Sequence, residues 1–79
     1  MIEEIKVNCG GRKIDVLADL KSLFVIKNDI HLKAQGIAPF SVHRIYRPGD
    51  WQLGNFIKGF YSLAEAKNFI RNKVKTHAH

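Results

Sequence analysis

Carboxylates are scarce in this chain, which has 7 Asp and Glu against 13 Lys and Arg and a net charge of +6. So few acids give little material for catalysis by a pair of carboxylates. Cysteine is nearly absent, because Cys9 is the single one, so no disulfide can form within the chain and a reducing cytoplasm is the expected compartment. The longest apolar run, residues 23–26, is far shorter than the roughly 20 residues of a membrane span. We therefore expect a soluble protein without a membrane partner.

The start of the chain also lacks a targeting signal. The first residues, MIEEIKVN, have neither a basic start nor an apolar stretch, so no signal peptide is expected. The 79 residues fit one domain, 1–79, in which the tail 76–79 lacks apolar anchors and is expected to fray. A domain of this size buries only about 60% of its unfolded surface and has no room for a deep active site. We expect a binding protein without a cofactor, not an enzyme.

The clearest structural signal lies in residues 59–75. Ser62 and Glu65 have the S-x-x-E spacing of a capping box at a helix start. Apolar residues then recur on one arc of a helical wheel, at about 100° per residue, with a basic stripe beside it. The arc contains Leu63, Ala66, Phe69, Ile70 and Val74, and the stripe contains Lys67, Arg71 and Lys75.

The pattern of the N-terminal half predicts two β-hairpins. Residues 2–9 and 12–18 alternate between apolar and polar, and Gly10-Gly11 between them can take the positive φ angles of a tight turn. Residues 24–26 and 30–34 predict a second hairpin that turns at Asn28-Asp29. For residues 19–27 the sequence leaves a short helix capped by Asp19 as an open alternative to a strand.

Two further strands are predicted at 40–46 and 51–60. Pro48-Gly49 between them is typical of a type II turn, which leaves the strand register open, and Gly54-Asn55 indicates a bulge. The whole pattern predicts an α+β fold: a small, mostly antiparallel β-sheet of five to six strands, with one C-terminal α-helix packed on one face.

Catalytic and metal-binding patterns are missing. His31 and His43 fall on separate predicted strands, and His77 and His79 fall on the tail, so no set of metal ligands converges. No serine stands in a nucleophile elbow, Cys9 has no neighbouring base in sequence, and Ser62 is explained as a helix cap. We expect neither a metal site nor a nucleophilic site.

Cations and aromatics gather in the C-terminal half. Residues 39–79 carry seven Lys and Arg against two acids, and seven of the eight aromatics lie at or after Phe40. Alternation predicts that the more apolar side of the last two strands packs on the helix, and that the other side faces solvent or a partner. The helix side would contain Phe40, Val42, Arg44, Tyr46, Trp51, Leu53 and Ile57, and the other side Ser41, His43, Ile45, Arg47, Gln52, Phe56, Lys58 and Phe60.

Basic side chains among aromatics favour nucleic-acid binding, because cations contact phosphates and rings stack on bases. The ligand could be DNA or RNA. The same surface suits an acidic host protein, as for a small phage-type inhibitor of a host or defence complex, and it also suits a homodimer. The expected binding residues are Arg44, Arg47, Trp51, Phe56, Lys58, Lys67, Arg71 and Lys75.

Residues 24–75 carry a resemblance in topology. Three strands followed by a helix, closing with FYSLAEAKxFI, are similar to the small arm-binding N-terminal domains of phage-type integrases. The pattern also resembles short phage and prophage reading frames that end in F-x-S-x-x-E-A. The resemblance implies a three-stranded sheet laid against DNA and binding alone, since no integrase catalytic domain is present.

Overall fold

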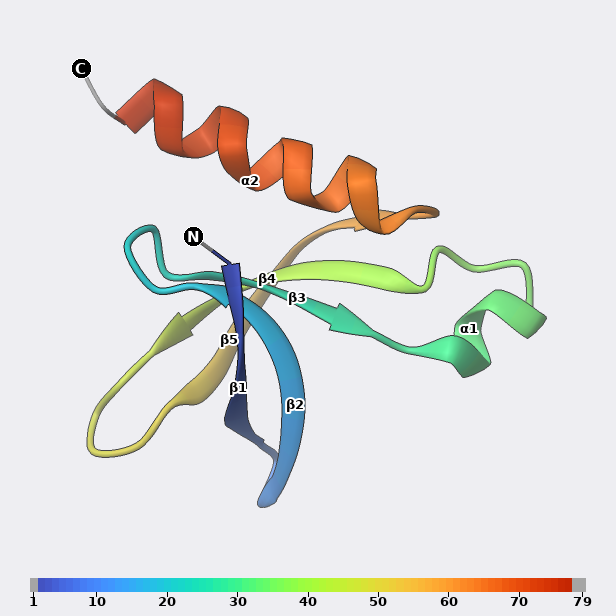
Figure 1. The fold of residues 1–79 in the computed structure, drawn as a ribbon. Coiled ribbons are helices and arrows are strands. Elements are labelled where there is room, and N and C mark those ends of the chain that lie inside the picture. The colour runs from blue at the N-terminus through green and yellow to red at the C-terminus, as the bar shows by residue number, and fades with distance from the viewer. Residues whose placement is uncertain (1, 78–79) are drawn as a thin grey trace.

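The computed structural model describes the backbone of residues 2–77 and the side chains of residues 2–73. Five strands and two helices follow one another along the chain (Figure 1). They are β1 (Ile2–Cys9), β2 (Arg12–Asp19), β3 (Phe24–Asn28), α1 (Ile30–Ala34), β4 (Phe40–Tyr46), β5 (Gln52–Phe60) and α2 (Leu63–His77). The predicted α+β class and the capped C-terminal helix are confirmed.

The first hairpin is confirmed in detail. Cys9 pairs with Arg12 across Gly10 and Gly11, whose φ angles are 59° and 87°. Glycine adopts positive φ at little steric cost, so this pair allows a two-residue turn whose twist matches the two strands.

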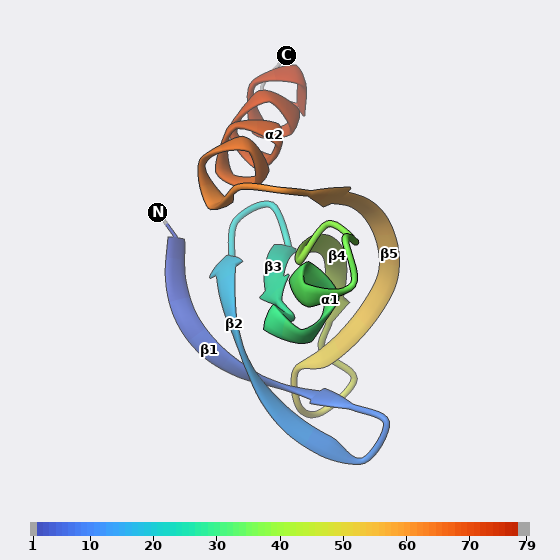
Figure 2. The same ribbon diagram turned by 90° about the vertical axis from the view of Figure 1, so that its right-hand side faces the viewer.

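The sheet closes into a barrel, which corrects the predicted open sheet. Consecutive strands pair antiparallel from β1 to β5, and the two ends of this meander then meet (Figure 2). β5 runs parallel to β1 and shares one bridged pair with it, Asn8 with Gln52. Beside it the Asn8 N–H donates to the Trp51 carbonyl at 2.8 Å. The closure gives the sheet an inner face and an outer face.

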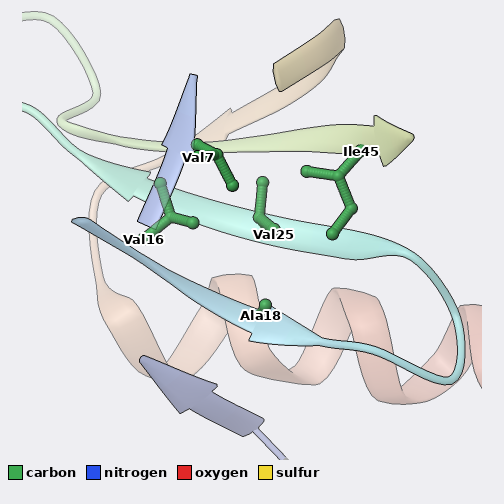
Figure 3. Close-up of a cluster of buried hydrophobic side chains, with 5 residues drawn as sticks. All are labelled: Val7, Val16, Ala18, Val25 and Ile45. Atoms are coloured by element: carbon green, nitrogen blue, oxygen red, sulfur yellow. The ribbon is translucent and has the colours of Figure 1, made fainter. Parts of the chain in front are cut away.

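Each face of the barrel has its own apolar cluster. The inner cluster consists of Val7, Val16, Ala18, Val25 and Ile45, which point toward one another from four strands (Figure 3). The outer cluster joins β3 and β4 to α2 and consists of Phe24, Ile26, Val42, Ala66 and Ile70. Full burial of one such side chain contributes about 1.5–3 kcal/mol, so both clusters are needed in so small a domain.

The two faces correct the predicted sides of β4 and β5. Val42 and Phe40 do pack on the helix as predicted, and so does Phe60, which was assigned to the other side. Ile45, predicted to face solvent, is only 3% exposed because it points into the barrel. Barrel closure buries a face that an open sheet would have left in solvent.

The predicted strand at 30–34 is wrong, because these residues form α1. Asp29 caps this short helix, and its side chain accepts a hydrogen bond from the His31 N–H at 3.1 Å. The predicted turn at Asn28-Asp29 therefore starts a helix instead of a hairpin. β3 pairs with β2 on one side and with β4 on the other.

Residues 19–27 contain a turn and a strand. The Asp19 carboxylate accepts from the N–H groups of Lys21 and Ser22 at 3.1 and 3.4 Å, as a cap would, but no helix follows. Leu23 ends this turn at a φ of 61°, a conformation that costs energy for a side chain with a Cβ. The open alternative is thus decided in favour of a strand, β3.

The bulge predicted at Gly54-Asn55 is confirmed by shifts in the β4–β5 register between Val42 and Ile45. A Cβ at Gly54 would lie 2.7 Å from the Arg44 carbonyl oxygen, closer than the two atoms can pack. Only glycine fits here without movement of the backbone.

We expect Gly54→Ala to lower the free energy of unfolding by about 1–3 kcal/mol, the usual cost of forcing extra atoms into a packed site. Gly49→Ala is the control, because a Cβ there meets nothing within 4 Å. Urea unfolding followed by tryptophan fluorescence measures both variants. Equal midpoints for the two would contradict the close approach at Gly54.

Candidate nucleic-acid interface

Two lysines and two phenylalanines form a continuous row along the edge where α2 meets β5. The Lys58 Nζ lies 5.5 Å from the centre of the Phe60 ring, and the Phe60 and Phe69 ring centres are 5.3 Å apart. The Lys73 Nζ lies 5.4 Å from the centre of the Phe69 ring. We call this row, Lys58–Phe60–Phe69–Lys73, the lysine–phenylalanine row. A ring contact orients an ammonium group without cancelling its charge, so both lysines remain able to attract anions.

The row is placed by a chain reversal between β5 and α2. Only residues 61 and 62 separate the two elements. The Ser62 side chain accepts from the Glu65 N–H at 3.2 Å, which confirms the predicted cap. The Tyr61 hydroxyl donates to the Gly36 carbonyl at 3.3 Å and ties the reversal to the segment before β4. The helix therefore returns alongside the strand that it follows (Figure 1).

A groove of about 480 Å³ opens beside the row, between the end of β5 and one side of α2. Its floor and walls combine aromatic rings, two side-chain amides, one ammonium group and one carboxylate. The lining residues are Lys58, Gly59, Phe60, Tyr61, Glu65, Asn68, Phe69 and Asn72. Such a mixture suits a flat, partly polar ligand.

Of the predicted helix stripe, the described side chains lie away from this groove. At 100° per residue, Lys67 and Arg71 each project about 160° around the helix axis from Phe69. Arg71 nevertheless donates from Nη1 to the Asn68 Oδ1 at 3.4 Å, so it reaches back toward the groove. The side chain of Lys75 lies outside the described residues.

The other predicted binding residues sit in three further places. Arg44 lies over the Phe24 ring at 4.5 Å, on the outer face of the barrel. Arg47 lies over the Trp51 ring at 5.0 Å, and Trp51 itself is half-buried against the inner cluster. Phe56 is 61% exposed and makes an edge contact with the His43 ring. The eight predicted residues therefore do not form one patch.

The sequence analysis identified Lys58 but missed the rest of the groove. Phe60 was predicted to face solvent or a partner, Phe69 was predicted on the apolar arc of the helix, and Lys73 was not singled out. The spacing of Phe69 and Lys73, four residues apart on a helix, was a usable signal for their contact. The contact between Phe60 and Phe69 was not predictable, because it depends on how the helix returns over β5.

Internal ion pairs leave the cations of the C-terminal half uncompensated. In residues 2–73 the ion pairs are Lys6–Asp15 at 2.9 Å and Lys13–Asp50 at 3.1 Å, both on the surface. The hydrogen bond from Lys13 holds the pKa of Asp50 below its ordinary value. Both pairs use cations from the N-terminal half, and one of them occupies a carboxylate of the C-terminal half. The basic character of that half therefore persists in the folded protein.

A second, smaller pocket has the opposite character. Its volume is about 190 Å³, and it lies where β1, β2, β3 and β4 meet the start of α2. Two carboxylates, of Glu4 and Asp15, line it beside Asn28 and apolar side chains. Asp15 is also the ion-pair partner of Lys6, so one of these two carboxylates is compensated.

A serine and a histidine, which the sequence predicted on the same side of the strand at 40–46, are in hydrogen-bond contact in the structure. The His43 Nδ1 lies 3.3 Å from the Gly54 carbonyl, so this nitrogen donates. The His43 Nε2 lies 3.0 Å from the Ser41 Oγ, from which it accepts. Ser41 is only 9% exposed, which hides its hydroxyl from a substrate. The two hydrogen bonds of His43 join Ser41 on β4 to Gly54 on β5.

Metal ligands do not gather in the described part of the chain. Across it, no group of three His, Cys, Asp or Glu side chains is close enough to hold an ion. His79 and the side chain of His77 lie outside the described residues. Neither helix, as far as it is described, has the length and apolar character to cross a membrane.

In comparisons with known proteins, no family model, no curated protein and no solved structure matches the chain. The integrase resemblance therefore rests on element order alone. It also leaves out β1 and β2, which the structure makes integral to the barrel.

The lowered pKa of His43 predicts how the stability of the fold depends on pH. Burial is the main cause that lowers the pKa of His43 in the folded protein. Between pH 7 and 5 the unfolded chain therefore takes up this proton more readily than the folded one, and the free energy of unfolding falls as the pH falls. Urea midpoints at pH 7, 6 and 5 should decrease, and less so in His43→Gln. If the urea midpoint fell equally with pH in the wild type and in His43→Gln, His43 would be ruled out as the cause.

Proposed function

We propose that this chain is a small, non-enzymatic module that binds nucleic acid, with phosphate contacts providing most of the affinity. The lysine–phenylalanine row carries the proposal. It places two ammonium groups at the ends of a pair of rings, along an open groove. Ammonium groups bind phosphates, and rings bind bases, so one edge offers both contacts that a nucleic acid needs.

The charge distribution supports the same proposal. Four described cations of the C-terminal half, Arg44, Arg47, Lys58 and Lys73, lie over aromatic rings, and Arg71 donates to Asn68. Their field therefore extends into solvent and attracts a polyanion over a distance of about 10 Å at 0.1 M salt. Arg44 and Arg71 are exposed and are available as further phosphate contacts.

A salt titration tests the proposal directly. The association constant should fall on a log–log plot with a slope of about −0.9 per phosphate contact on duplex DNA, or −0.7 on a single strand. The double variant Lys58→Ala, Lys73→Ala should bind more weakly and lower the slope by about 1 to 2 units. Fluorescence anisotropy with labelled oligonucleotides measures both quantities.

The matched control is Arg12→Ala with Lys33→Ala, which also removes two exposed charges, at the β1–β2 hairpin and in α1. This control should keep the wild-type slope to within a few tenths. An equal loss of affinity in both double variants would show that net charge alone drives binding. No binding by the wild-type protein to DNA or RNA at 50 mM salt would refute the proposal.

An apolar patch favours a protein partner as the second candidate. Ile37, Phe56 and Tyr61 are 48%, 61% and 69% exposed, which is unusual for side chains of this size. They come from segments that meet: a Cβ at Gly59 would lie 3.3 Å from Ala38 and 3.8 Å from the Phe56 ring. Together with the bond from Tyr61 to Gly36, these contacts gather one surface at the α1 end of the barrel.

For this candidate we expect Phe56→Ser to abolish capture of a stoichiometric protein from a nuclease-treated host lysate. Phe56 does not line the groove, so nucleic-acid binding should be unchanged in that variant. Tyr46→Ser is the control, because Tyr46 is similarly exposed, at 54%, but lies at the other end of β4. Capture that survives Phe56→Ser would exclude this patch, and light scattering would reveal a homodimer in its place.

A further inference from the structure

We propose that the groove between β5 and α2 receives one unpaired nucleobase, so that the ligand is a single strand of DNA or RNA and not a duplex. This inference rests on the nucleic-acid function proposed above and adds the form of the ligand and the position of one base. The first support is the aromatic wall. This wall consists of Phe60 from β5 and Phe69 from α2, which are both half-buried against the outer cluster, with an angle of 52° between their rings.

The exposed ring of Tyr61 completes the stacking surface. It lines the groove and is 69% exposed, yet its hydroxyl is held by the Gly36 carbonyl. A ring that is both exposed and positioned loses little entropy when a flat ligand stacks on it. Stacking tolerates any base sequence, because every base has an aromatic face.

The size of the groove selects for an unpaired base. A volume of about 480 Å³ lies within the roughly 300–1,000 Å³ of ligand-binding pockets and fits one nucleotide. In a duplex the faces of each base are covered by its neighbours, so a base can enter such a groove only after it has been unstacked. A single strand presents the base without that cost, which is a few kcal/mol per base.

The polar lining matches the edge of a base. Asn68 and Asn72 lie one helical turn apart and both line the groove. Each amide carries a donor and an acceptor, and base edges present both kinds of group. Arg71 donates to the Asn68 Oδ1 at 3.4 Å, which ties one of these amides to the basic flank of the helix.

The charges place the phosphates outside the groove. Glu65 is the one carboxylate among the lining residues, and it repels a phosphate that would enter. Lys58 and Lys73 sit at the ends of the aromatic wall, where the phosphates on either side of an inserted base would pass. The arrangement therefore favours a base inside the groove and the sugar–phosphate backbone of the strand outside it.

The test compares Tyr61→Ala with Tyr61→Phe and with Tyr46→Ala in the full chain. The probes are a labelled eight-nucleotide single strand, as DNA and as RNA, and the corresponding DNA duplex, in fluorescence anisotropy at 50 mM salt. We expect the wild-type protein to prefer the single strand. Tyr61→Ala should weaken single-strand binding about tenfold or more, while Tyr61→Phe, which keeps the ring, and Tyr46→Ala should bind nearly as the wild type does.

A second measurement does not depend on the variants. Ultraviolet cross-linking of a strand that contains 4-thiothymidine, followed by mass spectrometry, should label peptides of residues 58–61 or 68–73. Two results would contradict base binding in the groove without contradicting the nucleic-acid function. One is a duplex bound as tightly as the single strand, and the other is wild-type affinity in Tyr61→Ala. If the wild-type protein binds neither probe, the proposed function itself fails.

Discussion

The fold depends on the need to cover both faces of strand β3. Phe24 and Ile26 point outward beneath α2, while Val25 between them points into the barrel, and all three are at most 2% exposed. A strand buried on both sides needs two different covers. Closure of the meander provides the inner cover and the C-terminal helix provides the outer one. The groove follows from the second cover, because it forms where that helix runs beside β5.

This double burial also explains what the sequence could and could not predict. The first hairpin and the cap at Ser62 depend on residues adjacent in the chain, and both were predictable. β3 was ambiguous because residues 23–26 are continuously apolar, and an apolar run without alternation fits a buried helix as well as a buried strand. The segment 30–34 alternates as a strand does, yet it is a helix, capped by the Asp29 carboxylate, which accepts a hydrogen bond from the His31 N–H. Barrel closure had no local signal at all.

The residues of the candidate site also include some that the sequence could predict and some that it could not. Lys58 was predicted as a binding residue because basic and aromatic residues alternate along its strand. The amides of Asn68 and Asn72 were not, since nothing in the spacing of a helix shows which strand its polar flank will meet. Trp51 and Phe56 were the predicted stacking residues, yet Trp51 is half-buried and partly covered by Arg47. Tyr61, which the sequence places in an unremarkable turn, is the more accessible ring.

The closure between β1 and β5 has a further consequence for the mechanics of the barrel. The Asn8 amide points toward β5, and because amide directions alternate along a strand, those of Lys6 and Glu4 point the same way. The ladder with β5 ends at Asn8, so these earlier amides form an unpaired edge. The exposed charges of Glu4 and Lys6 discourage another strand from adding there. The barrel is thus closed by a seam with one bridged pair, fewer than any of its antiparallel ladders has.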